Sequence, residues 1–408
     1  MSNNQQIALD HDGTSIWKFL LGEMKPKGKY FTPFNIISVP IILVAAVIVI
    51  VRFWKGIGEV SNVSQDIPWG LWKGFNVVTG VAFAGGAYVL TFMVYILNMR
   101  KYHAIIRVTV LNGFLAYAFY AGALVLDLGR PWHIFNPIIG NSFGASSVLF
   151  LVAWHFLLYM VAQLIEFSPT ISEWIGARRA HKVLSGMTMA AVIFGITLSM
   201  LHQSGLGALF LMAKEKIHPL WYSEFIPIMF LVSSIFAGLS MVILEGSISD
   251  KVFFDQISDK NKKEQNGIVR GLSKICAGTM FAYFFLQLLV FVHKQQWDLL
   301  STGMGQWFLL EMLGFVLLPM ILFFISYRNN NITLIKVAAV ITMIGVIMNR
   351  LNVSIIGYRW DAAVRYVPSW MEVVVALAVI LTQIWIFRWV IRRMPVLRDS
   401  PSWANEHQ

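Results

Sequence analysis

Long apolar runs alternate with short polar stretches along almost the whole chain. Each run is long enough to cross a bilayer as an α-helix, which requires roughly 20 mostly apolar residues. The runs are too long for membrane β-strands and lack their strict alternation of apolar and polar residues. We therefore predict an all-α, polytopic membrane protein. Its ten spanning helices are expected at about Pro33–Val51, Leu71–Leu97, Ala104–Leu126, Gly144–Glu166, Val183–Leu201, Ile226–Leu244, Leu272–Val292, Phe308–Ser326, Ile332–Met348 and Met371–Val390.

The polar segments suggest how the chain is organised. Terminal segments of residues 1–30 and 391–408 flank a transmembrane domain of residues 31–390, and an even number of spans places both termini on one side. Thr14–Leu21 is expected to form a short interfacial helix. The longest hydrophilic stretch is Glu245–Gly271. We interpret it as a connector between two five-helix halves, the first ending near residue 244 and the second covering residues 272–390.

The composition agrees with a membrane protein. Of the 408 residues, 57% are hydrophobic and only 13% are charged, about half the charged share of a soluble domain. These values exclude a disordered chain, a disulfide-rich secreted domain and an ordinary cytosolic enzyme. The single cysteine, Cys276, excludes an iron–sulfur cluster held by this chain alone. The first 30 residues contain no apolar core of a cleavable signal peptide.

The positive charges predict the orientation. The net charge is +11, and 22 of the 32 Lys and Arg residues fall in the terminal segments and the even-numbered loops. Because cytoplasmic loops carry the excess of Lys and Arg, we expect both termini and the connector to be cytoplasmic. The odd-numbered loops are then external.

Ionisable and amide side chains beside the spans gather at the predicted external face. Such groups are costly in a bilayer and often functional. They are Asp127, Arg130, His202, Gln203, Glu311, Arg350 and Glu372. Nine of the 15 tryptophans, including Trp132 and Trp221, fall on the same face. An aromatic belt would be symmetric, so the excess suggests a docking surface or an aromatic pocket. The deep interior looks poorer, with His155 as its only ionisable residue, which argues against an ion pump built on carboxylates.

Three classes of function remain open from the residues alone. A b-type cytochrome needs facing histidine pairs; one haem held by residues at helix ends is conceivable, but two stacked haems are not. A secondary transporter predicts helices broken near the midplane, whereas proline interrupts few spans there. A quinone site needs an apolar slot, aromatic contacts and proton-carrying groups, which Asp127, His202, Glu311 and Glu372 supply. The small residues around Gly85 indicate tight helix packing or room for a flat ligand.

Five short motifs carry a resemblance to a known family. They are Pro68–Trp72, Asp127–Trp132 (D-L-G-R-P-W), Met200–Ser204 (M-L-H-Q-S), His218–Trp221 (H-P-L-W) and Glu245–Ser247 (E-G-S). In this order they resemble the NrfD/PsrC superfamily, in particular its ten-helix HybB-type members. The resemblance covers about Asp66 to Glu372, although Leu201 separates Met from His in the third motif.

The resemblance implies a membrane anchor in a bacterial inner membrane that exchanges electrons with the menaquinone pool and carries no haem or iron–sulfur cluster itself. A periplasmic iron–sulfur partner would dock on the external face. The catalytic subunit is a nickel–iron hydrogenase in HybB-type complexes, and a molybdopterin-type protein with a multihaem cytochrome in close relatives. The stretch Asn349–Val353 departs from the hydrogenase pattern and favours the second group.

The expected roles follow from this resemblance. His202 and Asp127 would carry protons to a menaquinone in the external leaflet, with Arg130 holding Asp127 ionised. Glu311 and Glu372 would line the site or its proton entry. The remaining expected binding residues are Gln203, Trp132, Trp221 and Gly85. For each carboxylate the alternative is a structural hydrogen bond or a salt bridge with Arg350. His218 is expected to support its loop or the partner interface, and His155 to be a packing residue.

Overall fold

The computed structural model describes residues 14–25, 27–28, 30–65, 67–140, 144, 146–257, 259–398, 400–401 and 403–404, and the structural statements below concern these residues. Asp66, where the family resemblance begins, lies outside them. The described chain is helical and forms no β-strand, only an isolated bridge between Ile217 and Tyr358. Ten of its helical segments are long and apolar enough to cross a membrane. The predicted all-α, multi-pass membrane protein is therefore confirmed.

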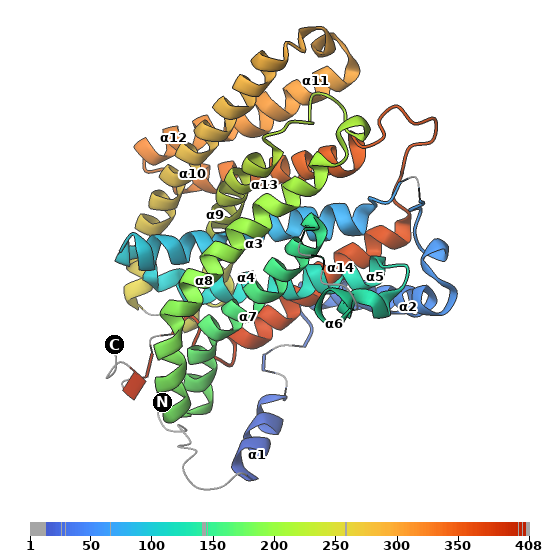
Figure 1. Cartoon of the computed structure of the whole chain (residues 1–408). Helices are drawn as coiled ribbons and strands as arrows, with labels where there is room; N and C mark the ends of the chain where they lie inside the picture. The colour runs from blue at the N-terminus through green and yellow to red at the C-terminus, as the bar shows by residue number, and fades with distance from the viewer. Residues whose placement is uncertain are drawn as a thin grey trace.

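The spanning segments include several composite helices. In chain order they are α2 (Pro33–Lys55); η2, α3 and η3 (Trp72–Gly80, Val81–Thr91, Phe92–Ile96); η4, α4 and α5 (Arg100–Ile105, Ile106–Gly122, Leu124–Asp127); α7 (Val148–Ile175); α8 (Arg178–Leu211); α9 (Ile226–Val252); α10 (Asp259–Lys294); α11, η9 and α12 (Gly303–Leu309, Leu310–Leu317, Leu318–Arg328); α13 and η10 (Ile332–Leu351, Asn352–Ile356); and α14 (Trp370–Ile391). Short helices precede or connect them: α1 (Thr14–Glu23), η1 (Ile57–Glu59), η5 (Pro131–Phe135), α6 (Asn136–Ile139), η6 (Lys214–Lys216), η7 (Phe254–Gln256) and η8 (Trp297–Ser301). The helix α1 confirms the short helix expected near residues 14–21, and it lies at the edge of the bundle in Figure 1.

Most spanning helices extend beyond the apolar runs that predict them. The helix α8, for example, covers residues 178–211, whereas its apolar run covers residues 183–201. A charged side chain ends an apolar run, but it does not interrupt the backbone hydrogen bonds of a helix. Glu166 and Glu245 were expected at helix ends and instead lie inside α7 and α9.

The predicted connector is wrong in both length and place. Because α9 continues to Val252 and α10 begins at Asp259, most of Glu245–Gly271 is helical. Six spanning segments precede it and four follow, so it does not separate two halves of five. Its Lys and Glu residues are good helix formers, and they extend the two helices beyond the apolar region.

Local sequence determines several helix ends. Thr32 and Asn331 accept hydrogen bonds from the backbone N–H groups of Asn35 and Leu334, at 3.2 and 3.0 Å, and so cap α2 and α13. The helix α7 ends at Gly176, whose φ of 74° is a left-handed conformation that glycine adopts without strain. These caps fix where the loops begin at each end of the bundle.

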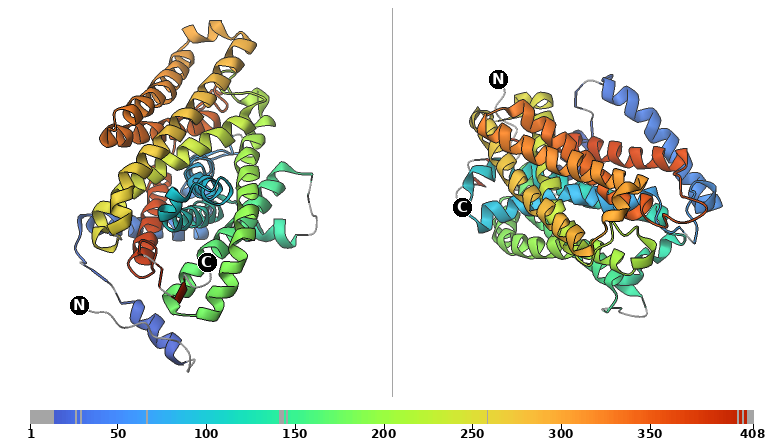
Figure 2. Two further views of the ribbon diagram at one scale, coloured as in Figure 1. Left: turned by 90° about the vertical axis from the view of Figure 1, so that its left-hand side faces the viewer. Right: turned by 90° about the horizontal axis from the view of Figure 1, so that it is seen from above.

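The spanning helices form two groups of four. The helices α3, α4, α7 and α8 surround one interior, and α9, α10, α12 and α13 surround another. In Figure 1 the second group (yellow to orange) lies above the first (cyan to green), and Figure 2 shows the same division from another side. The helices α2 and α14 pack against each other beside the first group. This repeated arrangement has no visible counterpart in the sequence.

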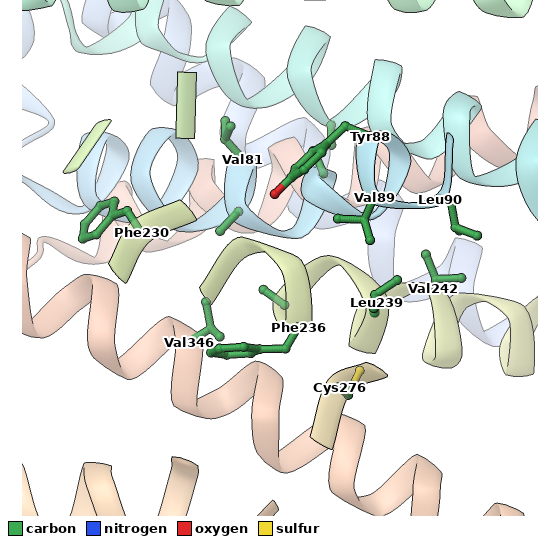
Figure 3. Packing of buried hydrophobic residues seen from close by; sticks show 14 of the residues in the cluster. Val81, Tyr88, Val89, Leu90, Phe230, Phe236, Leu239, Val242, Cys276 and Val346 are labelled. Carbon is green, nitrogen blue, oxygen red and sulfur yellow. The ribbon is translucent and has the colours of Figure 1, made fainter. Parts of the chain in front are cut away.

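The two groups meet at a close contact between α3 and α9. A methyl group on Gly85 would lie 2.7 Å from the carbonyl oxygen of Ser234, and one on Gly86 would lie 2.7 Å from that of Gly238. Figure 3 shows the apolar side chains of these helices around the contact, with the buried Cys276 beside them. Gly85 therefore serves helix packing, which was one of its two expected roles.

We predict that Gly238→Ala lowers the thermal stability of the purified protein. The added methyl group would overlap the backbone of Gly85 and Gly86, and overpacking of this kind costs about 1–3 kcal/mol. Gly246→Ala in the same helix is the control, because a methyl group there meets nothing within 4 Å. Thermal unfolding in detergent measures both variants. Equal melting temperatures for the two would contradict the contact.

Candidate functional site

Asp127 ends α5 at the predicted external end of the first helix group and is 4% exposed. Its Oδ2 lies 2.7 Å from Nζ of Lys73, in the first turn of η2. Lys73 also donates a hydrogen bond to the carbonyl oxygen of Pro68, at 3.0 Å. The expected partner, Arg130, is exposed instead. Leu128 is extended and ends the helix, so the chain leads Arg130 away from the carboxylate.

Arg52 approaches the same region from α2. Its Nε donates to the carbonyl oxygen of Leu126 at 2.7 Å, and a second guanidinium nitrogen donates to that of Leu128. The arginine thus holds the backbone on both sides of Asp127. Arg52 does not stand out in the sequence, because it ends the first apolar run, where a cation commonly reaches the membrane surface.

Glu372 uses both carboxylate oxygens to hold neighbouring loops. Its Oε2 accepts hydrogen bonds from the backbone N–H groups of Ser369 and Asn62, at 2.9 and 3.1 Å. Its Oε1 accepts one from the hydroxyl of Tyr366, at 2.6 Å. Burial, together with this carboxylate, raises the pKa of Tyr366 well above its usual value. Ser369 and Glu372 form a capping box at the start of α14, so the contacts favour the structural alternative for Glu372.

His202 lies inside the first helix group, on α8, and is 2% exposed. Its Nδ1 lies 3.1 Å from the carbonyl oxygen of Val152 on α7. Because a carbonyl only accepts, Nδ1 carries the hydrogen, and Nε2 is left as an acceptor. That Nε2 is buried without a hydrogen-bond partner. The rings of Tyr117 and Phe156 lie beside the imidazole, with centroids 5.5 and 6.0 Å from its own.

Gln203 and Asn76 add further unpaired atoms. Nε2 of Gln203 donates to the carbonyl oxygen of Val81 at 2.9 Å, while its Oε1 has no partner. Asn76 is fully buried on η2, and neither its Oδ1 nor its Nδ2 has a partner. A buried polar group without a partner costs roughly 1–3 kcal/mol. Such groups in native proteins commonly bind water or a ligand.

One helix connects these groups. Lys73, Asn76 and Val81 follow each other along η2 and the start of α3. Lys73 contacts Asp127 and Val81 contacts Gln203. At about 1.5 Å per residue, these two contacts lie roughly 10–12 Å apart along the helix. The wide π-helical turns of η2 present Lys73 and Asn76 there, and such turns are frequent at functional sites. Asn76 is not among the residues predicted from the sequence, because a neutral amide does not alter the charge pattern. The one signal for Asn76 in the sequence is its position as a single asparagine within the predicted span Leu71–Leu97.

Glu311 and Trp221 come together in the second helix group instead. Oε2 of Glu311 accepts hydrogen bonds from Nε1 of Trp221 and Nδ2 of Asn352, at 2.7 and 2.6 Å, and Oε1 accepts one from Nδ2 of Asn349, at 2.6 Å. Arg350 directs its hydrogen bonds to Ser233 and the backbone of Phe230. The expected external cluster is therefore divided between the two groups, and the Glu311 carboxylate is satisfied by protein donors.

The other expected residues lie at the periphery. Trp132 is 71% exposed. The His218 ring packs between Trp221 and Trp360, with centroid distances of 5.4 and 4.7 Å. Burial lowers the pKa of His218, so this imidazole is neutral at pH 7. These contacts are those expected of a residue that supports its loop.

The interior is richer in polar groups than predicted. Asn112 donates to Oε2 of Glu245 at 2.7 Å and accepts from Gln383 at 3.1 Å. Gln163 and Glu166 are also buried or partly buried and have unpaired side-chain atoms. The expectation of an interior with His155 alone is wrong, because α7 and α9 continue past these carboxylates.

Comparisons with known proteins agree with this architecture. Residues 59–360 match the family model described as "Polysulphide reductase, NrfD". A protein of Nitratidesulfovibrio vulgaris is 40% identical over 378 residues, which is 92% of this chain and 97% of the relative. The "Probable Ni/Fe-hydrogenase 2 b-type cytochrome subunit" of Escherichia coli is 26% identical over 93% of this chain and 96% of the relative. The "Menaquinone reductase, integral membrane subunit" of N. vulgaris is 25% identical over 78% of this chain and 80% of the relative. With the family model matching most of the chain, this protein belongs to the polysulphide reductase NrfD family.

Proposed function

We propose that this chain is the membrane subunit through which a respiratory oxidoreductase complex exchanges electrons with the quinone pool, with menaquinone as the substrate. The names of the hydrogenase and menaquinone reductase relatives support this reading. The observation that carries it is the set of unpaired polar atoms of Asn76, His202 and Gln203. These atoms lie in a helix group rich in apolar and aromatic side chains, which is the environment that a quinone ring requires.

Reduction of a quinone to a quinol consumes two electrons and two protons. In our proposal the electrons arrive from a partner at the external face. The Asn76 amide donates a hydrogen bond to one ring carbonyl, and Nε2 of His202 exchanges a proton with the other ring oxygen. Asp127, held by Lys73 at 2.7 Å, exchanges protons between the site and the surface. The chain has no activity of its own in this scheme, because the electrons come from another subunit.

The topology and the partners are part of the same proposal. The charge asymmetry supports cytoplasmic termini in a bacterial inner membrane. Large apolar side chains are exposed after α5, at Trp132 (71%), Phe135 (59%) and Ile139 (79%). We propose that a periplasmic iron–sulfur protein docks here. It would connect to a nickel–iron hydrogenase, or to a molybdopterin-type protein with a multihaem cytochrome.

A b-type cytochrome is the second candidate, because the name of the E. coli relative contains this term. A b haem needs a ligand on each side of its iron. His202 and His155 have unpaired ring nitrogens, but the helices α8 and α7 that carry them pack directly against each other, and the His202 ring is hydrogen-bonded to the backbone of α7. These residues fit a haem between α7 and α8 poorly.

We predict that the purified chain shows no haem absorption. A visible spectrum of the protein, recorded oxidised and then reduced with dithionite, checks this. A Soret band with reduced α and β bands, in proportion to protein, would contradict the proposal and favour the cytochrome. Substrate accumulation by proteoliposomes that contain this chain alone would instead favour a secondary transporter.

We predict that His202→Ala reduces quinone-linked turnover of the intact complex by about 100-fold, within the range that a positioned acid–base group supplies. Turnover with an artificial dye acceptor, measured on the same preparation, is expected to remain unchanged, because dyes take electrons from the partner subunits. His293→Ala, which removes an exposed histidine at the end of α10, is the matched control. Quinone-linked turnover at the wild-type rate in His202→Ala would show that this assignment is wrong.

We predict that Asn76→Leu weakens quinone binding without lowering the thermal stability of the protein. Loss of the amide is expected to raise the KM for the quinone about tenfold, the cost of one missing hydrogen bond of about 1.4 kcal/mol. The melting temperature of the quinone-free protein is expected to stay the same or rise, because an unpaired buried amide is removed. A lower melting temperature with an unchanged KM would assign Asn76 a structural role instead.

A further inference from the structure

The helix α2 lies outside both groups of four helices, yet it directs one buried cation toward the first group. Its buried residues are Ser38, Ala45, Ile48 and Arg52, which share one face of the helix at spacings of seven, three and four. Ala45 and Ile48 pack with Val375 and Ala376 of α14 in an apolar cluster. Arg52 continues the same face and is 3% exposed. Its surroundings are therefore protein rather than lipid or water.

The guanidinium of Arg52 binds the two carbonyl groups that flank Asp127. Its Nε donates to the carbonyl oxygen of Leu126 at 2.7 Å, and another nitrogen donates to that of Leu128. The last carbonyl groups of a helix lack partners within the helix, and a cation at this end is favourable. A planar guanidinium presents both donors in a fixed arrangement, which the single ammonium group of lysine does not.

Charged groups reach Asp127 from three other helices. Lys73 of η2 forms its ion pair, while Arg52 of α2 and Glu372 of α14 interact with it electrostatically. Arg130 follows in the chain and is exposed. One buried cationic side chain, Arg52, and one partly buried one, Lys73, thus face two buried carboxylates, and one cation and one carboxylate come from the α2–α14 pair.

We propose that Arg52 is a positioning residue of the quinone reaction, because it holds the backbone on both sides of Asp127 and so fixes the carboxylate against Lys73. The α2–α14 pair then forms part of the site, and its role goes beyond that of a membrane anchor. This inference rests on the proposed function. It assigns Arg52 no contact with the quinone, since its action passes through Asp127.

The test compares Arg52→Met with Arg52→Lys in the intact complex. Arg52→Met keeps an unbranched, flexible side chain, although a shorter one, and removes the charge and the donors. We expect quinone-linked kcat to fall by about tenfold, less than the 100-fold that a misplaced catalytic group can cost. The acidic limb of the pH–activity profile is expected to move to higher pH, because loss of a nearby cation disfavours an ionised carboxylate. The KM for the quinone is expected to stay within about twofold, because the bound quinone does not touch Arg52.

Arg52→Lys restores the charge without the fixed arrangement of two donor nitrogens, so we expect the pH profile to return while kcat recovers only in part. Lys55→Met is the matched control, because Lys55 is exposed in the last turn of the same helix. Dye-linked turnover reports whether each complex is assembled, and this value is expected to match the wild type in all three variants.

Two outcomes would overturn the inference. One is an Arg52→Met complex with wild-type kcat and pH profile. The other is an equal fall of quinone-linked and dye-linked turnover with an unshifted profile, which indicates a purely structural role. Failure of the proposed function looks different, because His202→Ala and Asn76→Leu would then leave quinone turnover intact. If those two variants lose quinone turnover and Arg52→Met does not, only the role of Arg52 is wrong.

Discussion

A polar side chain buried in a membrane bundle must find its partner within the protein or in a ligand, because lipid offers none. This constraint accounts for the arrangement of nearly every charged group at the predicted external end. Glu372 is held by two backbone N–H groups and a tyrosine hydroxyl, and Glu311 by a tryptophan and two asparagines. Asn76 and His202 depart from it, since each keeps buried atoms without partners. These unsatisfied atoms include both donors and acceptors, whereas the described external cluster of the second group leaves Nε of Arg350 unpaired, and this difference favours the first helix group as a place for a ligand.

The two helix groups share a plan but differ in chemistry. In the second group the external polar cluster closes on itself around Glu311, and Arg350 lies 3.4 Å from the Phe230 ring centroid and bonds to Ser233. At the corresponding end of the first group, buried polar atoms of Asn76, His202 and Gln203 lack hydrogen-bond partners. The α2–α14 pair packs beside this first group, where it contributes Arg52 and Glu372. The two helix groups thus differ in their polar contacts and in the helices beside them, and the proposed quinone position lies in the group that α2 and α14 flank.

The sequence predicted the elements well and their contacts less well. Apolar runs located all ten spans, because bilayer thickness fixes their length. They did not reveal where helices continue through charged residues, so the connector at residues 245–271 and the depth of Glu166 were misjudged. Motifs located Asp127 and His202, but the partner of Asp127 depends on how the chain turns at Leu128, which no local pattern specifies. The hydrogen bonds of Arg52 to Leu126 and Leu128, and the burial of Asn76 without a partner, depend on residues distant in sequence and therefore appear only in the fold.

Photolabelling of the intact complex with an azido-substituted menaquinone analogue tests the central claim most directly. The account predicts adducts on peptides from η2 and α8, near residues 72–81 and 199–206, and predicts that excess unlabelled menaquinone suppresses them. Adducts that respond to competition but lie on η9 and η10, around Glu311 and Asn352, would place the quinone in the second helix group and contradict the account.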